Sequence, residues 1–174
     1  MTRLRAAAIA LAASLATGCG YQVGAHGDLM PSSVKTIAIA AFENKTTRYK
    51  LARLLPQDIG REFLSRTRYR IVEDPNQADA VLTGTVESFS ANATIFDPVS
   101  SRATAAEAAV TLKNITLKDR RTGKTLFSKS EAEYRQRYEI ALDPQQYFDE
   151  SGPAMERISR DVAHGVVSGI LEAF

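Results

Sequence analysis

The sequence is poor in the residues that carry out catalysis, bind metals or form cross-links. Its 174 residues include one cysteine, two histidines and no tryptophan. A single cysteine excludes a disulfide framework, and neither His26 nor His164 has a partner at metal-ligand spacing. No run of about 20 apolar residues exists, which excludes a chain that crosses a membrane repeatedly as helices. We therefore expect no metal, no cofactor and no catalytic residues, and we expect structural or solvated roles for both histidines.

The first 18 residues have the pattern of a secretory signal peptide. Arg3 and Arg5 precede an apolar segment at residues 6–16, and small residues follow up to Gly18. Eleven apolar residues span only about half of the roughly 30 Å that a membrane-crossing helix needs. We expect residues 1–18 to be removed by a signal peptidase.

The cysteine that follows this segment is a candidate lipidation site. The sequence Leu-Ala-Thr-Gly-Cys at residues 15–19 resembles a bacterial lipobox, although Ala16 stands where leucine is usual. The alternative is an ordinary secretion signal with an unrelated cysteine. An unpaired thiol is a liability in an oxidising compartment, so we expect Cys19 to be acylated. Gly20 replaces the aspartate typical of inner-membrane retention, which favours the periplasmic face of the outer membrane.

Removal of the signal peptide changes the charge balance. Loss of Arg3 and Arg5 from 22 basic residues leaves 20, which equals the 20 acidic residues. A neutral chain has no general attraction for polyanions, so an anion site must be a local cluster. The basic segments also lack the interleaved aromatic residues typical of single-stranded nucleic-acid binders. We therefore expect no nucleic-acid partner.

The mature chain alternates strand and helix patterns. Residues 19–33 are expected to form a lipidated tether, and residues 34–174 a single α/β domain. Strand patterns cover residues 34–42, 80–91, 106–119 and 124–138, and amphipathic helix patterns cover residues 51–67 and 155–173. The order β-α-β-β-β-α predicts an α+β fold, with two helices packed on a four-stranded mixed sheet. The strands that flank the first helix are expected to be parallel.

Two local irregularities interrupt these patterns. Pro56 lies within the first helical pattern, so it either kinks the helix or marks its first turn. In the third strand the apolar parity changes between Leu112 and Ile115, which predicts a β-bulge near Asn114. The glutamates of the last strand, Glu131, Glu133 and Glu139, are expected to form a solvated edge.

One charged cluster is a candidate binding site. Residues 118–124 (KDRRTGK) place four cations and one acid at the tip of a predicted hairpin. Guanidinium groups bind phosphate in bidentate geometry, and lysine adds a point charge. The alternative is a charged turn that only discourages aggregation. We take Lys118, Arg120, Arg121 and Lys124 as candidate anion contacts, with Arg102 in the preceding long loop as a weaker candidate.

Taken together, these features resemble the lipopolysaccharide-assembly lipoprotein LptE family. The matching segments are GCGY at 18–21, VKTIAI at 34–39, FEN at 42–44, ADAVLTG at 78–84, LKDRRTGK at 117–124 and ILEAF at 170–174. The resemblance implies a non-enzymatic outer-membrane lipoprotein that plugs the LptD β-barrel, helps it assemble and aids lipopolysaccharide delivery to the outer leaflet. By motif position, Arg120, Arg121 and Lys124, with Lys118 next, would contact lipopolysaccharide phosphates.

Other classes of protein share part of this pattern. The segment IAIAAFEN at residues 37–44 also resembles lipoproteins that activate penicillin-binding proteins or form the curli-secretion pore. A pore former needs long amphipathic strands, and the segment after Ala91 offers little apolar alternation. A periplasmic hydrolase is disfavoured because no nucleophile or metal motif is present.

Overall fold

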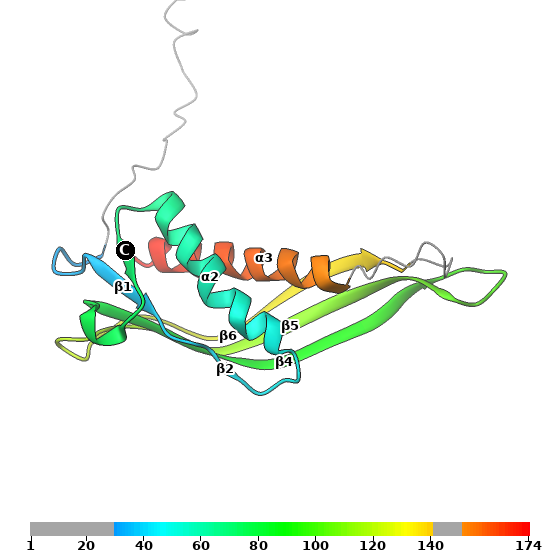
Figure 1. The fold of residues 1–174 in the computed structure, drawn as a ribbon, viewed down its shortest axis with the longest axis horizontal. Coiled ribbons are helices and arrows are strands. Elements are labelled where there is room, and N and C mark those ends of the chain that lie inside the picture. Colours follow the sequence, from blue (N-terminus) through cyan, green and yellow to red (C-terminus); the bar gives the residue numbers. More distant parts are fainter. Residues whose placement is uncertain (1–29, 141–150) are drawn as a thin grey trace, which may run out of the picture.

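The structure is a computed structural model that describes residues 30–140 and 151–174. Helices α2 and α3 lie on one face of a six-stranded sheet (Figure 1), which confirms the α+β class with two helices on a mixed sheet. The elements in chain order are β1 (Thr36–Ile39), β2 (Glu43–Asn44), α2 (Tyr49–Arg66), β3 (Arg70–Val72), the 3₁₀ helix η2 (Pro75–Gln77), β4 (Ala80–Phe96), β5 (Ala103–Asp119), β6 (Thr125–Glu139) and α3 (Ser151–Glu172).

The sheet combines a parallel part and an antiparallel part. Its strand order is β3-β1-β4-β5-β6, and β2 pairs with β4 beyond the end of β1. β1 is parallel to both β3 and β4, so the parallel pairing across α2 is confirmed. β4, β5 and β6 follow one another as antiparallel strands. The sheet has more strands than the four predicted, because β2 and β3 are too short for their side chains to form a visible alternation.

The first predicted strand, 34–42, is interrupted in the structure. β1 ends at Ile39, opposite Leu82, and pairing resumes at Glu43, opposite Thr85, so the first strand contains one extra residue. The bend buries the ring of Phe42, which is 4% exposed, against Gly84. A Cβ atom at position 84 would lie 2.3 Å from Phe42 Cε1. The interruption therefore follows from the burial of one aromatic ring.

Helix α2 has the four-residue spacing that the sequence indicates. Leu51, Leu55, Ile59 and Phe63 are fully buried. The helix begins at Tyr49, so Pro56 lies in its interior and does not mark its first turn. Because proline has no N–H group, the helical hydrogen bond to the carbonyl four residues earlier is missing there.

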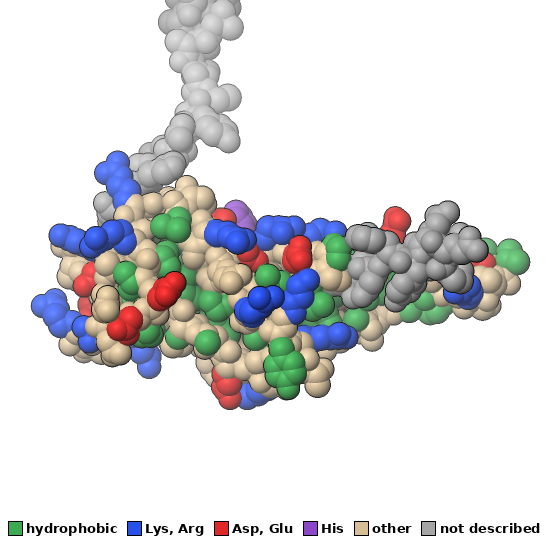
Figure 2. All heavy atoms as spheres, viewed as in Figure 1, with side chains coloured by type: hydrophobic (Ala, Val, Ile, Leu, Met, Phe, Trp, Pro, Cys, Tyr) green, Lys and Arg blue, Asp and Glu red, His purple; other side chains and the backbone are tan. Residues whose placement is uncertain are grey.

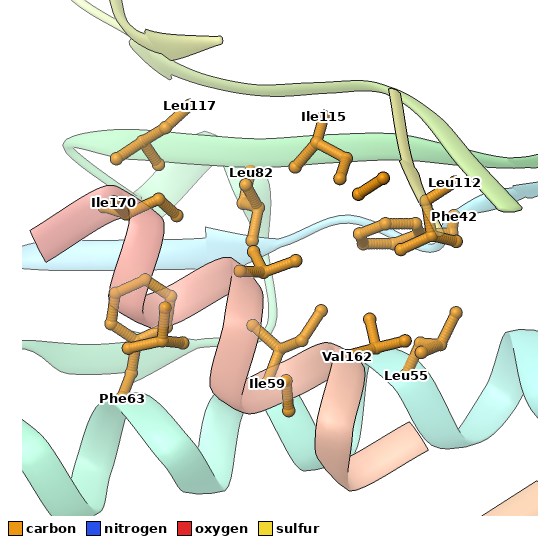
Figure 3. Packing of buried hydrophobic residues seen from close by; sticks show 14 of the residues in the cluster. Phe42, Leu55, Ile59, Phe63, Leu82, Leu112, Ile115, Leu117, Val162 and Ile170 are labelled. Atoms are coloured by element: carbon orange, nitrogen blue, oxygen red, sulfur yellow. The ribbon is translucent and has the colours of Figure 1, made fainter. Parts of the chain in front are cut away.

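The core lies between the two helices and the sheet. Ile59 and Phe63 of α2 and Val162 and Ile170 of α3 point toward the strands, where they meet Leu82, Leu112, Ile115, Leu117 and Phe42 (Figure 3). A polar contact joins the helices at the same level, where the buried Asp58 accepts a 2.6 Å hydrogen bond from Ser159 Oγ. Met30, within the predicted tether, is also buried in this core, so the folded body begins before residue 34.

The predicted bulge in β5 is confirmed. Asn114 has a φ angle of 54°, and the pairing shifts from Thr83–Thr116 to Thr85–Lys113. The shift returns apolar side chains of both parities, Leu112 and Ile115, to the covered face, and both are fully buried. A long strand thus keeps one apolar face despite a change of phase in its sequence.

β4 and β5 form a hairpin that projects beyond the helices (Figure 1). β4 continues past the predicted end at Ala91 to Phe96, and residues 97–102 form the tip. Asp97 Oδ1 organises the tip by accepting hydrogen bonds from the N–H groups of Val99 and Ser100, at 3.1 and 2.6 Å. These bonds lower the pKa of Asp97, and the bond from the Ser100 N–H group contributes most.

The start of β1 is held by one carboxylate. Asp79 Oδ2 accepts hydrogen bonds from the backbone N–H groups of Lys35 and Thr36 and from the Thr36 hydroxyl, each at 2.9 Å. These bonds lower the pKa of Asp79. The bond from the Lys35 N–H group has the largest effect and the bond from the Thr36 hydroxyl the next largest. This side chain therefore connects the start of β1 to the segment that leads into β4.

Neither helix in the described part of the chain is both long enough and apolar enough to span a membrane.

We predict that Gly84→Ala destabilises the domain by about 1–3 kcal/mol, because the new methyl group overlaps the buried Phe42 ring. The matched control is Gly169→Ala on α3, where a Cβ atom would lie 3.5 Å from Phe127 Cζ, an ordinary contact distance. The control should be neutral or stabilising by about 0.5–1 kcal/mol, because alanine favours a helix. Urea unfolding measures both. Equal effects of the two substitutions would contradict the proposed role of Gly84.

We predict that Asp79→Asn lowers the free energy of unfolding at neutral pH by about 1–2 kcal/mol, through the loss of charge-assisted hydrogen bonds. Because folding lowers the pKa of Asp79, the wild-type carboxylate contributes its full stability above the unfolded pKa. That contribution is lost as the pH falls through the lower folded pKa. The difference between the two proteins should therefore shrink below about pH 4. A difference that stays constant from neutral to acid pH would count against this role.

Candidate anion-binding site

The β5–β6 turn is a compact loop built around Asp119. The Asp119 N–H bonds to the Lys124 carbonyl at 2.9 Å, and the Gly123 N–H bonds back to the Asp119 carbonyl at 2.9 Å. Gly123 has a φ angle of 72°, a conformation that glycine adopts without steric cost. Asp119 Oδ1 accepts a 2.8 Å hydrogen bond from the Thr122 N–H group, which is the main cause of the lowered pKa of Asp119. The one acid of the cluster therefore stabilises the turn.

The four predicted cations have two different environments. Lys118, Arg121 and Lys124 are exposed, and their side chains form no salt bridge within residues 30–140 and 151–174. Arg120 donates a 2.9 Å hydrogen bond from Nε to the Ala78 carbonyl, and its backbone N–H group bonds to the Asp79 carbonyl at 2.8 Å. Arg120 thus fastens the turn to the segment before β4. Arg120 is also exposed, but this bond engages its guanidinium group, whereas the other three side chains have no such contact within the described residues.

A second basic cluster lies at the same end of the domain. Lys35, Arg68 and Arg70 line a depression of about 440 Å³, together with Met30, Pro31, Ser32, Val34 and Tyr69. β1, β3 and β4 begin at this end, and β5 turns into β6 there, so both clusters lie at the same end of the strands. Several Lys and Arg side chains are visible at this end in Figure 2.

The sequence alone does not predict this second cluster. Lys35 and Arg68 are 33 positions apart in the sequence, and the parallel pairing Thr36–Arg70 brings their strands together. Residues 69–72 have the sequence pattern of a short extended segment, and its parallel pairing with the first strand would have placed Arg70 beside Thr36. Without that pairing no local run of charge marks the site.

The other predicted residues lie elsewhere or outside the described part. Arg102 is exposed at the tip of the β4–β5 hairpin, at the opposite end of the sheet from the β5–β6 turn. His164 is exposed on α3, with Nδ1 3.1 Å from Glu62 Oε1. Cys19 and His26 are outside the described residues. Within the residues that are described, no group of three or more His, Cys, Asp or Glu side chains is arranged to hold a metal ion.

The edge strand β6 matches its prediction. Glu131, Glu133 and Glu139 are exposed along it, so the solvated edge is confirmed. Arg135 lies between two carboxylates, at 2.9 Å from Glu107 and 3.0 Å from Glu133. These hydrogen bonds raise the pKa of Arg135, and the bond to Glu107 contributes most. Alternating charges of this kind discourage pairing with another strand.

Solved structures share this fold at low sequence identity. One is the solution NMR structure of an uncharacterized lipoprotein B from Nitrosomonas europaea, with a TM-score of 0.54 and 13% identity over 79% of this chain and 81% of that chain. Another is the crystal structure of a putative lipoprotein from Caulobacter crescentus, with a TM-score of 0.53 and 15% identity over 82% of this chain and 93% of that chain. No curated protein sequence matches the chain.

The family comparison is more specific than the fold comparison. The family model described as LptE, lipopolysaccharide-assembly, matches residues 34–169, from just before β1 almost to the end of α3. The match spans most of the chain and includes both helices and every strand. The chain therefore belongs to the LptE family of lipopolysaccharide-assembly proteins.

Proposed function

We propose that this protein is a non-catalytic lipoprotein, anchored through Cys19 to the periplasmic face of the outer membrane. It plugs an LptD-like β-barrel, helps that barrel assemble and aids delivery of lipopolysaccharide to the outer leaflet. The observation that carries the proposal is the family match over residues 34–169. The lipobox-like segment before Cys19 supports the anchor.

The two faces of the sheet suit a plug inside a barrel. Helices cover the apolar face, and the opposite face carries polar side chains, including Thr83, Thr111, Lys113 and Thr116. The lumen of an outer-membrane barrel is polar. A polar sheet face can therefore lie against the polar inner wall of a barrel.

The β5–β6 turn is the proposed contact for lipopolysaccharide phosphates. Lys118, Arg121 and Lys124 are exposed and form no salt bridge within the described residues, so each is available to a phosphate. Asp119 is only 7% exposed and is bonded to the Thr122 N–H group. The turn consequently presents mostly positive charge, as a phosphate-binding loop requires.

We predict that the acylated full chain, extracted from outer membranes, co-purifies with one large β-barrel protein. Crosslinking in cells followed by mass spectrometry identifies the partner, and the mass of the mature chain reports the lipid on Cys19. Recovery of a peptidoglycan synthase would support the activator class, and recovery only of further copies of this chain would support a pore-forming class. Either of these results would overturn the proposed partner.

We predict that the double charge reversal Arg121→Glu with Lys124→Glu weakens lipopolysaccharide binding about tenfold at low salt, because four units of charge change beside the phosphates. The effect should diminish at high salt, where exposed charges are screened. Arg120 is left intact, because its bond to the Ala78 carbonyl holds the turn. Equilibrium binding of the purified chain to lipopolysaccharide at two salt concentrations measures the effect.

Two comparison variants complete this test. Arg53→Glu with Arg160→Glu makes the same change of charge on the exposed faces of α2 and α3 and should leave binding unchanged. Arg102→Glu tests the opposite end of the sheet. Loss of binding in the Arg102 variant, with full binding in the turn variant, would place the phosphate contact at the β4–β5 tip and overturn the proposal.

A further inference from the structure

The depression beside β1 and β3 combines charge with apolar surface. Lys35, Arg68 and Arg70 line it, and their side chains form no salt bridge within the part of the chain that the structure describes. Its apolar lining comes from the buried side chains Met30 and Val34, both 3% exposed, and from Tyr69, which is 5% exposed. At about 440 Å³ the depression lies in the size range of small-molecule sites.

Among the described residues, no carboxylate lines this depression. The acid that interacts with Lys35 is Asp79, whose Oδ2 atom already accepts three hydrogen bonds from Lys35 and Thr36. The lining therefore has a positive rim beside an apolar wall. The ligand that complements both features is an amphiphile with a phosphate group, because guanidinium groups pair with phosphate and the apolar wall accepts hydrocarbon.

The position of the depression identifies the source of such a ligand. Met30 lies in its wall, and Cys19 is only eleven residues earlier in the chain. Eleven fully extended residues reach at most roughly 40 Å. If Cys19 carries the anchor, as proposed above, this end of the domain stays close to the leaflet that holds the acyl chains.

We propose that the depression binds the phosphate headgroup of an anionic glycerophospholipid in that leaflet, with Lys35, Arg68 and Arg70 as the contacts. The inference rests on the proposed lipid anchor but not on the lipopolysaccharide contact at the β5–β6 turn. Binding there holds the β1–β3 end of the domain at the surface of the leaflet that carries the anchor.

The test uses the acylated full chain reconstituted into phosphatidylcholine vesicles with and without phosphatidylglycerol. A photoreactive benzophenone side chain replaces Ser32, which lines the depression, or Val99, which is 92% exposed at the far hairpin tip. We expect phosphatidylglycerol adducts from position 32 and at least tenfold fewer from position 99. The triple variant Lys35→Glu, Arg68→Glu, Arg70→Glu should reduce the position-32 adducts about tenfold or more.

The controls separate this site from its alternatives. Arg53→Glu with Arg160→Glu should leave the adducts unchanged, and so should inorganic phosphate at the same concentration as phosphatidylglycerol, because free phosphate lacks the apolar contacts. Equal adduct yields in the wild type and the triple variant would overturn the proposal, and loss of the adducts with equimolar inorganic phosphate would assign the depression to free phosphate instead. A loss of lipopolysaccharide binding in the Arg121 and Lys124 variant, with adducts unchanged, would support two separate sites. A chain without acyl groups on Cys19 would remove the anchor and therefore the basis of this inference.

Discussion

Burial of one sheet face under two helices is the constraint on which the whole domain depends. Ile59 of α2 and Val162 of α3 pack over the same strands, where Leu82, Leu112 and Ile115 belong to the same buried cluster. Each fully buried aliphatic side chain contributes about 1.5–3 kcal/mol. Features that look irregular serve this face: the bend at Phe42 and the bulge at Asn114 both return apolar side chains to it. Apart from the buried Asp58–Ser159 contact between the helices, most polar groups lie on the other face and at the two ends.

The two ends of the sheet differ in chemistry. The end where β1, β3 and β4 begin gathers cations from three separate stretches of sequence, and Asp79 and Asp119 there are engaged with backbone N–H groups. The opposite end is a hairpin tip whose described residues include the exposed apolar side chains Phe96 and Val99 and the exposed cation Arg102. A chain with nearly balanced charge, 22 basic and 20 acidic residues, can thus have a positive end, because charge is distributed by topology and not by composition.

Periodicity predicted the parts of the fold that repeat. Helix α2 and the three long strands were found because each repeats its apolar spacing over several turns or pleats, and the phase change near Asn114 was visible for the same reason. β2 was missed, since two residues cannot display a period, and the sequence indicated β3 only as a short extended segment and not as a strand of the sheet. The cluster of Lys35, Arg68 and Arg70 was missed with them, because only the β1–β3 pairing brings it together.

The role of Arg120 could not be predicted from composition either. Its guanidinium bonds to the carbonyl of Ala78, a residue 42 positions earlier that carries no sequence signal for such a contact. The neighbouring Arg121 has the same residue type in the same turn and points to solvent. The local sequence located the cluster of charges. Long-range packing then gives Arg120 a structural role and leaves Arg121 available to bind an anion.

The β4–β5 hairpin is longer than the layer that stabilises it. Seventeen strand residues extend about 55 Å, whereas the 22 residues of α3 extend about 33 Å. β6 accompanies β5 as far as Ala105, and the Ile140 N–H group bonds to the Thr104 carbonyl, so only the Phe96–Ala103 pair and the tip extend beyond the third strand. Two strands without a third are marginally stable in water. A partner that binds the tip must therefore offset the entropy cost of ordering this short end, and binding is stronger where a surrounding wall already restricts it.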